Sequence, residues 1–167
     1  MRFLFIILLF TSCYTFAQQP FFYKYDDENG FQSNEVYQIE QDDFGFIWIG
    51  CDAGVFRFDG VNFKQFVHSQ QNGVSISHLI IDKKQRVWCQ NFSGQIFYIQ
   101  QDSIHLFKDF TKQTASYPSY TVFDNQIVTN IDDFTNVYDA STGQLKSVIS
   151  NKTTTSVKPF FPLLFTK

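Results

Sequence analysis

The residues of this sequence whose types could do chemistry are two carboxylate pairs and three histidines. Paired carboxylates can divide acid and base roles in hydrolysis, and the pairs here are Asp42-Asp43 and Asp132-Asp133. Adjacent side chains in a strand or turn point apart, and aspartate is a standard turn residue, so both pairs indicate turns. The histidines lack the spacing of metal ligands and do not match one another: His68, His78 and His105. We therefore expect no catalytic residue, no metal site and no cofactor.

The charge balance argues against a nucleic-acid partner. The chain has 13 Lys+Arg against 16 Asp+Glu. Removal of residues 1–17, which contain Arg2 and no acidic residue, makes the net charge one unit more negative. Binding to phosphate backbones needs clustered positive charge. The one tight basic cluster, Lys83-Lys84 with Arg86, lies in a predicted turn, where solvated charge is the usual finding.

The first residues are typical of an export signal. Arg2 precedes an apolar run over residues 3–10, and small residues follow, so we predict cleavage between Ala17 and Gln18. The run is much shorter than the ~20 residues of a membrane span. A lipoprotein signal is the alternative, because small residues precede Cys13, which could be lipidated. Both alternatives predict an exported, periplasmic chain.

A repeat of about 40 residues is the most informative pattern, and it defines the elements that position every other residue. Trp48 and Trp88 lie 40 positions apart, and the same frame pairs further residues without an insertion: Asp42 with Asp82, Gly54 with Gly94, Phe56 with Ile96, and Phe58 with Tyr98. A third, degenerate copy has Ile127 and Val128 in place of Val87 and Trp88, with Val137 and Tyr138 matching Phe97 and Tyr98.

Each repeat contains four short strands separated by turn residues. The expected strands are 35–40, 46–50, 55–58 and 61–66 in the first repeat, and 76–81, 86–90, 95–99 and 103–107 in the second. Asp59-Gly60 is expected to form a two-residue hairpin turn. Aromatic residues make up 19% of the chain, which favours strands. The fold class is therefore all-β, with β-propeller blades of four antiparallel strands and about three blades of an incomplete propeller.

Packing explains the repeated residues without any chemistry. Trp48 and Trp88 are expected to fill the gap between stacked sheets, since aromatics dominate core burial. The glycines of the first repeat are expected to serve turns and close contacts between blades: Gly45, Gly50, Gly54 and Gly60. Cys51 and Cys89 occupy different places in neighbouring repeats, so we expect no disulfide between them.

The repeats divide the chain into six segments. These are a signal peptide (1–17), an N-terminal extension (18–32), blade 1 (33–72), blade 2 (73–112), a degenerate blade 3 (113–149) and a truncated tail (150–167). Because known rings use about four to eight blades, we expect the chain to be a piece of a longer protein that supplies the remaining blades.

The first repeat resembles the two-component regulator propeller repeat. The resemblance is carried by residues 33–39, 41–50 and 53–60, which include Asp42, Gly45, Trp48, Gly50 and the Phe58-Asp59-Gly60 ending. Cys51 departs from the threonine usual in the family, and we expect this exchange to remove a hydroxyl hydrogen bond. The second repeat has Cys89-Gln90 where the family has Ile-Gly, and the third lacks the tryptophan.

The resemblance implies an environmental sensor. Proteins of this family, typically from Bacteroidetes, carry large periplasmic propellers fused to an inner-membrane helix and a cytoplasmic histidine kinase, which is absent here. The resemblance implies a ligand, and carbohydrate is one possible class. We expect the ligand to bind at the face formed by the blade-connecting loops. The resemblance also allows dimerisation of the parent protein. The alternatives are a secreted protein-interaction scaffold and a propeller-fold enzyme acting on polysaccharide.

Overall fold

The computed structural model describes residues 20–113 and 118–151, and the chain there is almost entirely β-structure. The predicted export signal, its cleavage position between Ala17 and Gln18, Cys13 and most of the predicted tail lie outside the described residues. A short 3-10 helix, η2 (Asp27–Asn29), precedes the strands. No helix in the two described ranges has the length and apolar character needed to cross a membrane.

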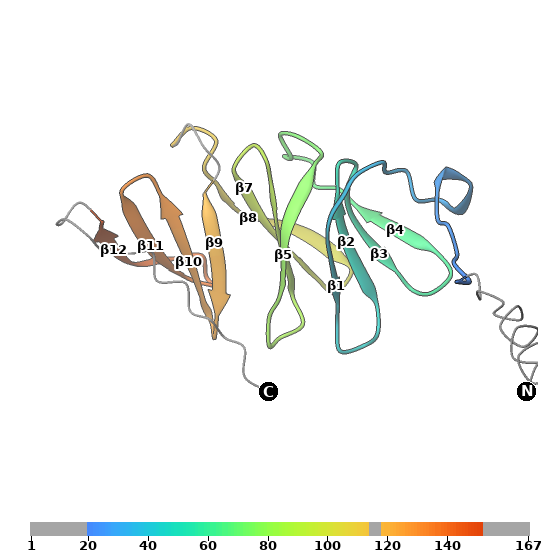
Figure 1. The fold of residues 1–167 in the computed structure, drawn as a ribbon. Helices are drawn as coiled ribbons and strands as arrows, with labels where there is room; N and C mark the ends of the chain where they lie inside the picture. The colour runs from blue at the N-terminus through green and yellow to red at the C-terminus, as the bar shows by residue number, and fades with distance from the viewer. Residues whose placement is uncertain (1–19, 114–117, 152–167) are drawn as a thin grey trace, which may run out of the picture.

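In residues 20–113 and 118–151, twelve strands form three four-stranded antiparallel sheets, each in simple up-and-down order (Figure 1). We call the sheets blades 1, 2 and 3. Blade 1 contains β1 (Val36–Gln41), β2 (Ile47–Cys51), β3 (Gly54–Phe58) and β4 (Phe63–Phe66). Blade 2 contains β5 (Ile76–Ile81), β6 (Val87–Asn91), β7 (Gln95–Gln100) and β8 (Ser103–Asp109). Blade 3 contains β9 (Ser119–Phe123), β10 (Gln126–Ile131), β11 (Phe134–Asp139) and β12 (Leu145–Ser150).

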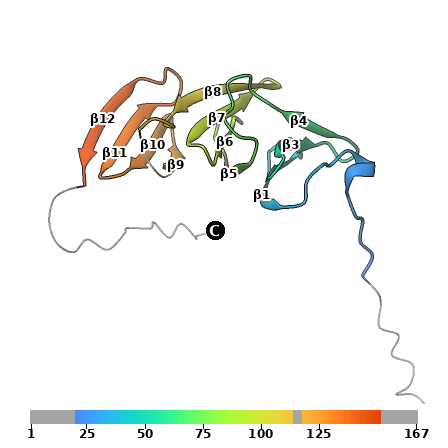
Figure 2. The ribbon, with the colours of Figure 1, turned by 90° about the horizontal axis from the view of Figure 1, so that it is seen from above.

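The blades stand side by side along a curved row, which Figure 2 shows from above. This is the arrangement of neighbouring propeller blades, and the fold is the all-β propeller arc that the repeat predicts. Strand direction defines two ends of each blade. The turns between the first and second strands lie at one end, which we call the turn end. The segments that join one blade to the next, such as residues 67–75, lie at the other, which we call the linker end.

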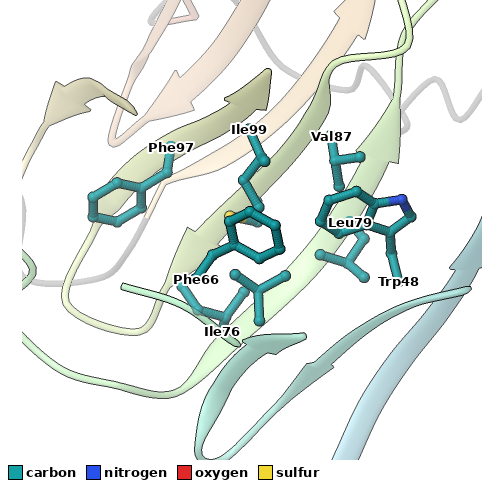
Figure 3. Packing of buried hydrophobic residues seen from close by; sticks show 9 residues of the cluster. Trp48, Phe66, Ile76, Leu79, Val87, Phe97 and Ile99 are labelled. Carbon is teal, nitrogen blue, oxygen red and sulfur yellow. The ribbon is translucent and has the colours of Figure 1, made fainter. Parts of the chain in front are cut away.

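The core lies between blades. Trp48, Val55 and Phe66 project from blade 1 and pack on apolar residues of blade 2, as Figure 3 shows for the labelled side chains: Ile76, Leu79, Val87, Phe97 and Ile99. Trp88 and Ile96 project in the same way from blade 2 onto blade 3. Each tryptophan therefore buries its indole against the following sheet, and blade stacking is the main source of apolar burial.

The third strand of blade 2 is displaced by one residue from the 40-residue frame. Four residues separate the paired Gly50 and Val55 in blade 1, whereas five separate Gln90 and Ile96 in blade 2. Tyr98 therefore occupies in blade 2 the position that Arg57 occupies in blade 1, and Ile99 occupies the position of Phe58. The expected pairing without insertion, Phe56 with Ile96 and Phe58 with Tyr98, is wrong, because a turn can absorb an extra residue without disturbing the flanking strands.

Blade 3 returns to the spacing of blade 1, since four residues separate the paired Asn130 and Thr135. Tyr138 thus lies opposite Ile127, as Phe58 lies opposite Ile47. The sequence pairing of Tyr138 with Tyr98 is displaced by one residue for the same reason.

The turn between β3 and β4 is longer than the expected two-residue hairpin. The Asp59 carboxylate accepts hydrogen bonds from the backbone N–H groups of Val61 (2.8 Å) and Asn62 (2.7 Å). Because these groups bind a side chain, they do not extend the ladder, and β4 begins at Phe63 instead of residue 61. Gly60, at φ 99°, occupies the left-handed region that this turn requires.

Candidate functional site

The repeat residues with polar side chains converge at the turn end of each blade. Asp42 accepts hydrogen bonds from the indole Nε1 of Trp48 (2.8 Å) and from the backbone N–H groups of Phe44 and Phe46. Gly45, at φ 90°, completes this turn. One carboxylate thereby holds the turn and fixes the orientation of the buried indole, which is a structural use of the aspartate.

Asp82 repeats this arrangement in blade 2 and adds a buried ion pair. Its carboxylate accepts from Trp88 Nε1 (2.9 Å) and from Arg86 Nε (2.7 Å), and both charged side chains are almost fully buried. Burial raises the pKa of Asp82, but the hydrogen bonds from Trp88 and Arg86 together with the Arg86 charge outweigh it, so the net pKa lies below the ordinary value.

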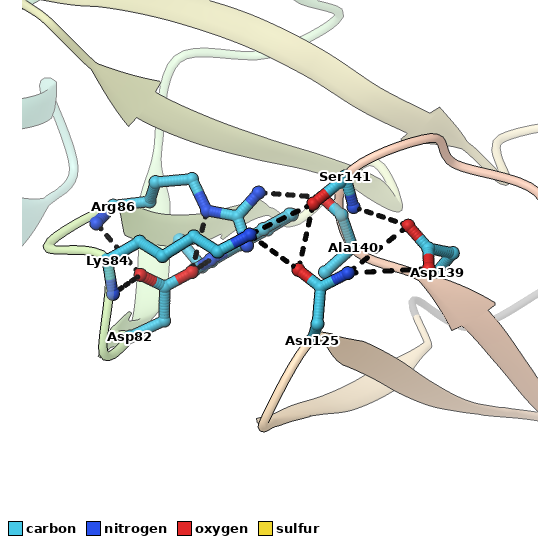
Figure 4. A network of polar contacts seen from close by, with 8 residues as sticks. Asp82, Lys84, Arg86, Asn125, Asp139, Ala140 and Ser141 are labelled. Atoms are coloured by element: carbon cyan, nitrogen blue, oxygen red, sulfur yellow. Dashed lines mark hydrogen bonds and ion pairs between the residues drawn. The ribbon is translucent and has the colours of Figure 1, made fainter.

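Arg86 also joins blade 2 to blade 3, in the network that Figure 4 shows. Its Nη1 donates to the carbonyl oxygen of Ala140 (2.7 Å), and Lys84 Nζ donates to Asn125 Oδ1 (2.9 Å) and Ser141 Oγ (3.1 Å). The turns of the two blades are thus held together by charge-assisted hydrogen bonds.

Blades 1 and 2 are linked at the turn end by a different set of polar contacts. Gln85 Nε2 donates to Asp43 Oδ2 (2.7 Å), and the backbone N–H of Asp43 donates back to Gln85 Oε1 (3.0 Å). Asp102 forms ion pairs with Arg57 and Lys64. The hydrogen bond from Lys64 lowers the pKa of Asp102 most, and the charge of Arg57 adds to it.

Two cavities open between blades 1 and 2, and both lie at the turn end. The first, of about 320 Å³, is lined by the aromatic side chains of Phe44, Phe46 and Trp48 together with the charged pair Arg57 and Asp102. The Arg57 guanidinium lies over the Phe46 ring, 4.6 Å from its centroid. Phe44 is 73% exposed at the rim. An aromatic wall beside a few fixed polar groups is a common composition for a small-molecule site.

The second cavity, of about 460 Å³, lies between the first strands of the two blades. Glu40, Gln41 and Asp43 line it from blade 1, and Leu79, Ile81 and Gln85 line it from blade 2. Gln85 borders both cavities, so the two form one candidate region. This region lies at the turn end of the blades. The sequence analysis expects the ligand at the opposite end, which carries the blade-connecting loops.

The remaining residues of the repeat pattern lie in turns or in contacts within and between blades. A Cβ on Gly50 would meet the carbonyl oxygen of Ile76 in blade 2 at 2.9 Å. Gly54 and Gly94 adopt positive φ at the turns between second and third strands. Tyr98 packs on Trp88, with ring centroids 5.0 Å apart.

Cys51 and Cys89 are buried free thiols. Cys51 Sγ lies 3.2 Å from the carbonyl oxygen of Gly54, so the thiol donates a weak hydrogen bond across the hairpin. A thiol hydrogen bond is therefore present at the position where the family usually has the threonine hydroxyl. Within the described residues, no group of three or more His, Cys, Asp and Glu side chains is arranged to hold a metal ion.

Sequence reasoning missed Arg57, Asp102 and Gln85 as site residues. Arg57 and Asp102 are 45 positions apart and belong to different blades. The stacking of the two sheets brings them together. A signal was present in the charged turn over residues 82–85, where the first repeat has a glycine turn.

Comparison with known proteins finds a family match and a shared fold. Residues 30–53 match the family described as "Two component regulator propeller". A comparison with curated protein sequences finds no significant match. Among the solved structures that are similar to the chain, three have 16–19% identity, a level that shows the fold alone.

Two of them are extracellular domains of proteins from B. thetaiotaomicron that are described as hybrid two-component systems. The first has a TM-score of 0.60 and 19% identity over 74% of this chain and 18% of that one, and the second has 0.56 and 16% over 75% and 20%. The third is a catalytically inactive virginiamycin B lyase from Staphylococcus aureus solved with quinupristin, with 0.55 and 19% over 71% and 42%.

The chain thus spans about a fifth of the length of the two-component domains and less than half of the lyase. The matched residues 30–53 cover the turn, the aspartate and the tryptophan that build the first blade. Residues 30–53 thus match the two-component regulator propeller repeat, and the described blades share the propeller fold of these structures.

Proposed function

We propose that this chain is the periplasmic ligand-sensing propeller region of a two-component signal-transduction sensor, and that the parent protein supplies the membrane segment, the histidine kinase and further blades. The family match at residues 30–53 is the observation that supports this role. The shared fold with extracellular domains of two-component systems is consistent with it. The region is proposed to bind and transmit, and not to catalyse.

We place the ligand in the candidate region at the turn end of blades 1 and 2. The aromatic wall of Phe44 and Phe46 can stack on an apolar sugar face, while Arg57 and Asp102 can hydrogen-bond to hydroxyl groups. A carbohydrate is therefore the ligand class that the lining fits. The similarity to the lyase is one of fold, and it gives no support for catalysis here.

The test is a binding screen of residues 18–167 against a panel of neutral and acidic oligosaccharides by isothermal titration calorimetry. We expect at least one oligosaccharide to bind, and Phe44→Ala to weaken it at least about tenfold, which is the effect of about 1.4 kcal/mol of lost contact. Phe123→Ala, at a 65% exposed aromatic of blade 3, is the matched control and should leave binding unchanged.

Absence of binding by the whole panel, or equal losses in the two variants, would contradict the proposed ligand site. The proposed kinase is tested separately by sequencing the gene past the Lys167 codon. Continuation into more repeats, a membrane helix and a kinase supports the sensor, whereas unrelated sequence after a stop codon favours a secreted interaction scaffold.

A further inference from the structure

The first cavity of the candidate region has a counterpart one blade further along, between blades 2 and 3. The turns over residues 42–46 and 82–86 are equivalent in the 40-residue frame. In each turn the aspartate carboxylate accepts two backbone N–H groups with one oxygen and the tryptophan Nε1 with the other. The surroundings of Asp82 therefore show what this part of the repeat binds.

Between blades 2 and 3 the place is filled by two cations of the chain itself (Figure 4). The Arg86 guanidinium donates to Asp82 Oδ2 and to the carbonyl oxygen of Ala140, at 2.7 Å in each case. It also lies over the Trp88 ring, 4.8 Å from its centroid. Lys84 crosses to blade 3 beside it. A cation at this place is thus bound by a carboxylate, a carbonyl oxygen and an aromatic face.

Between blades 1 and 2 these two cations are replaced by aromatic residues. Phe44 and Phe46 occupy in blade 1 the positions that Lys84 and Arg86 occupy in blade 2. Neither phenylalanine side chain can donate a hydrogen bond to the carboxylate of Asp42, which lines the first cavity and is 9% exposed. Within the described residues, no cation forms an ion pair with this carboxylate.

The blade 2 residues that line the first cavity correspond to the blade 3 residues that bind the two cations. Ile99 and Tyr138 have the same position in their sheets, and the turns between first and second strands have the same place in each blade. Three lining residues therefore match the acceptors of Figure 4: Gln85 matches Asn125, Gln101 matches Ala140, and Asp102 matches Ser141. The first cavity is thus the place of the bound cations, without cations at positions 44 and 46.

The charge of the lining favours a cation from outside the chain. One cation, Arg57, lines the two cavities of the candidate region together with four carboxylates: Glu40, Asp42, Asp43 and Asp102. Arg57 pairs with Asp102, which also binds Lys64, so the other three carboxylates have no ion pair within the described residues. A buried carboxylate is stabilised by a nearby cation, and the aromatic faces beside Asp42 also attract positive charge.

We propose that the ligand of the candidate region carries a free amino group, which binds to Asp42 as the Arg86 guanidinium binds to Asp82. Its sugar ring then lies against Phe44 and Phe46, so the ligand is an amino sugar. The assignment rests on the proposed carbohydrate-binding function and names the class of carbohydrate. It also accounts for the difference between the two places, because blade 2 carries the cation in its own sequence and blade 1 takes it from the ligand.

The first experiment compares two probes that differ in charge: the glucosamine trimer of chitosan and its N-acetylated counterpart from chitin. Each is titrated into residues 18–167 by isothermal titration calorimetry at about pH 6, where the sugar amines are protonated. We expect the glucosamine trimer to bind at least about tenfold more tightly, which is the effect of one hydrogen bond to a charged group.

Equal affinities, tighter binding of the acetylated trimer, or absence of binding by the glucosamine trimer would overturn the inference. Binding of the acetylated trimer or of neutral oligosaccharides alone would leave the proposed carbohydrate site intact. Failure of the amino-sugar assignment is therefore distinguishable from failure of the proposed function.

The second experiment supplies the cation from within the chain. F46R/R57Y gives blade 1 the pair that blade 2 has at the same two positions, Arg86 and Tyr98. We expect the introduced guanidinium to bind Asp42 and to abolish the preference for the glucosamine trimer, because the place is then filled. The melting midpoint should change by less than about 5 °C, since blade 2 carries the same pair beside the same aspartate and tryptophan.

F46L/R57Y is the matched control, because it removes the same two side chains without supplying a cation near Asp42. It should weaken the binding of both trimers and still favour the glucosamine trimer by about tenfold. Loss of the preference in both double variants, or its retention in F46R/R57Y, would overturn the inference. The comparison of the two trimers on the unmodified chain does not depend on these variants, so it decides the matter if F46R/R57Y misfolds.

Discussion

At the scale of single residues, the repeat uses its aspartates to hold tryptophans. Asp42 and Asp82 each accept the indole N–H of the tryptophan six positions later, and each closes a turn with its second oxygen. Buried carboxylates are stable only when their oxygens are hydrogen-bonded, and these turns provide the donors. The aspartate that sequence analysis assigned to a turn therefore also orients the core.

Removal of the Asp82 carboxylate should destabilise the chain strongly. Asp82→Ala leaves the buried Arg86 guanidinium without its counter-charge and the Trp88 N–H without its acceptor. We expect a loss of about 3–5 kcal/mol in the free energy of unfolding, measured by urea denaturation. Asp102→Ala removes an exposed ion-paired carboxylate and should cost about 0–1 kcal/mol. Similar losses in the two variants would contradict this account.

The same carboxylate should make stability depend on acidic pH. The folded-state pKa of Asp82 lies below its unfolded value of 3.8, so the folded protein favours the ionised form. Its contribution is fully present above the unfolded pKa and is lost as the pH falls through the folded pKa. Urea midpoints measured from pH 6 to pH 2 should fall below about pH 4. Asp82→Asn should flatten this part of the curve, and an unchanged slope would exclude Asp82 as its source.

At the scale of elements, contact between blades limits which residues the strands can carry. Gly50 lies in β2 opposite the start of β5, where the backbone of blade 2 approaches it closely. Gln38 of β1 exchanges two hydrogen bonds with the backbone of Leu79 in β5, at 2.8 and 2.9 Å. The first strands of neighbouring blades are thus held at a fixed separation, and this separation shapes the candidate region.

Gly50→Ala should test this close approach. The added Cβ would meet the carbonyl oxygen of Ile76 at 2.9 Å, which is too close for van der Waals contact, so β5 must shift. We expect a loss of about 1–3 kcal/mol in unfolding free energy. Ser119→Ala, at an exposed position of β9, is the control and should lie within about 0.5 kcal/mol of the unmodified chain. A neutral Gly50→Ala would show that the blades are not in tight contact here.

At the scale of the whole molecule, stability comes from stacking three thin sheets. Each sheet alone has little to bury, and the two interblade clusters contain most of the buried apolar side chains. The position of a blade in the row therefore determines how much a given repeat residue contributes to the free energy of unfolding. The same place in the repeat is fully buried where the structure describes a following blade, as at Trp88, and only partly covered at Val128 in the last described blade.

The comparison of Trp88 with Val128 tests this dependence on position. Trp88 is fully buried between blades 2 and 3, whereas Val128, its counterpart in blade 3, is half-buried. Trp88→Ala should reduce the unfolding free energy by about 3–5 kcal/mol. Val128→Ala should cost less than about 1.5 kcal/mol, since it removes less surface and leaves no enclosed cavity. A large loss at Val128 would indicate that its face is covered in solution.

The sequence by itself determined the fold class, the resemblance of the first repeat to a known propeller repeat and the number of described sheets, because short alternating strands and a 40-residue period are local signals that the tryptophans mark clearly. It also determined the turn role of Asp42 and Asp82. Only the tertiary structure decided the frame of β7, the ion pair of Arg57 with Asp102 and the position of the cavities. These depend on how one sheet lies against the next. A residue inserted in a turn changes the side of the sheet on which the side chains of the following strand lie, relative to the 40-residue frame, without changing the local pattern.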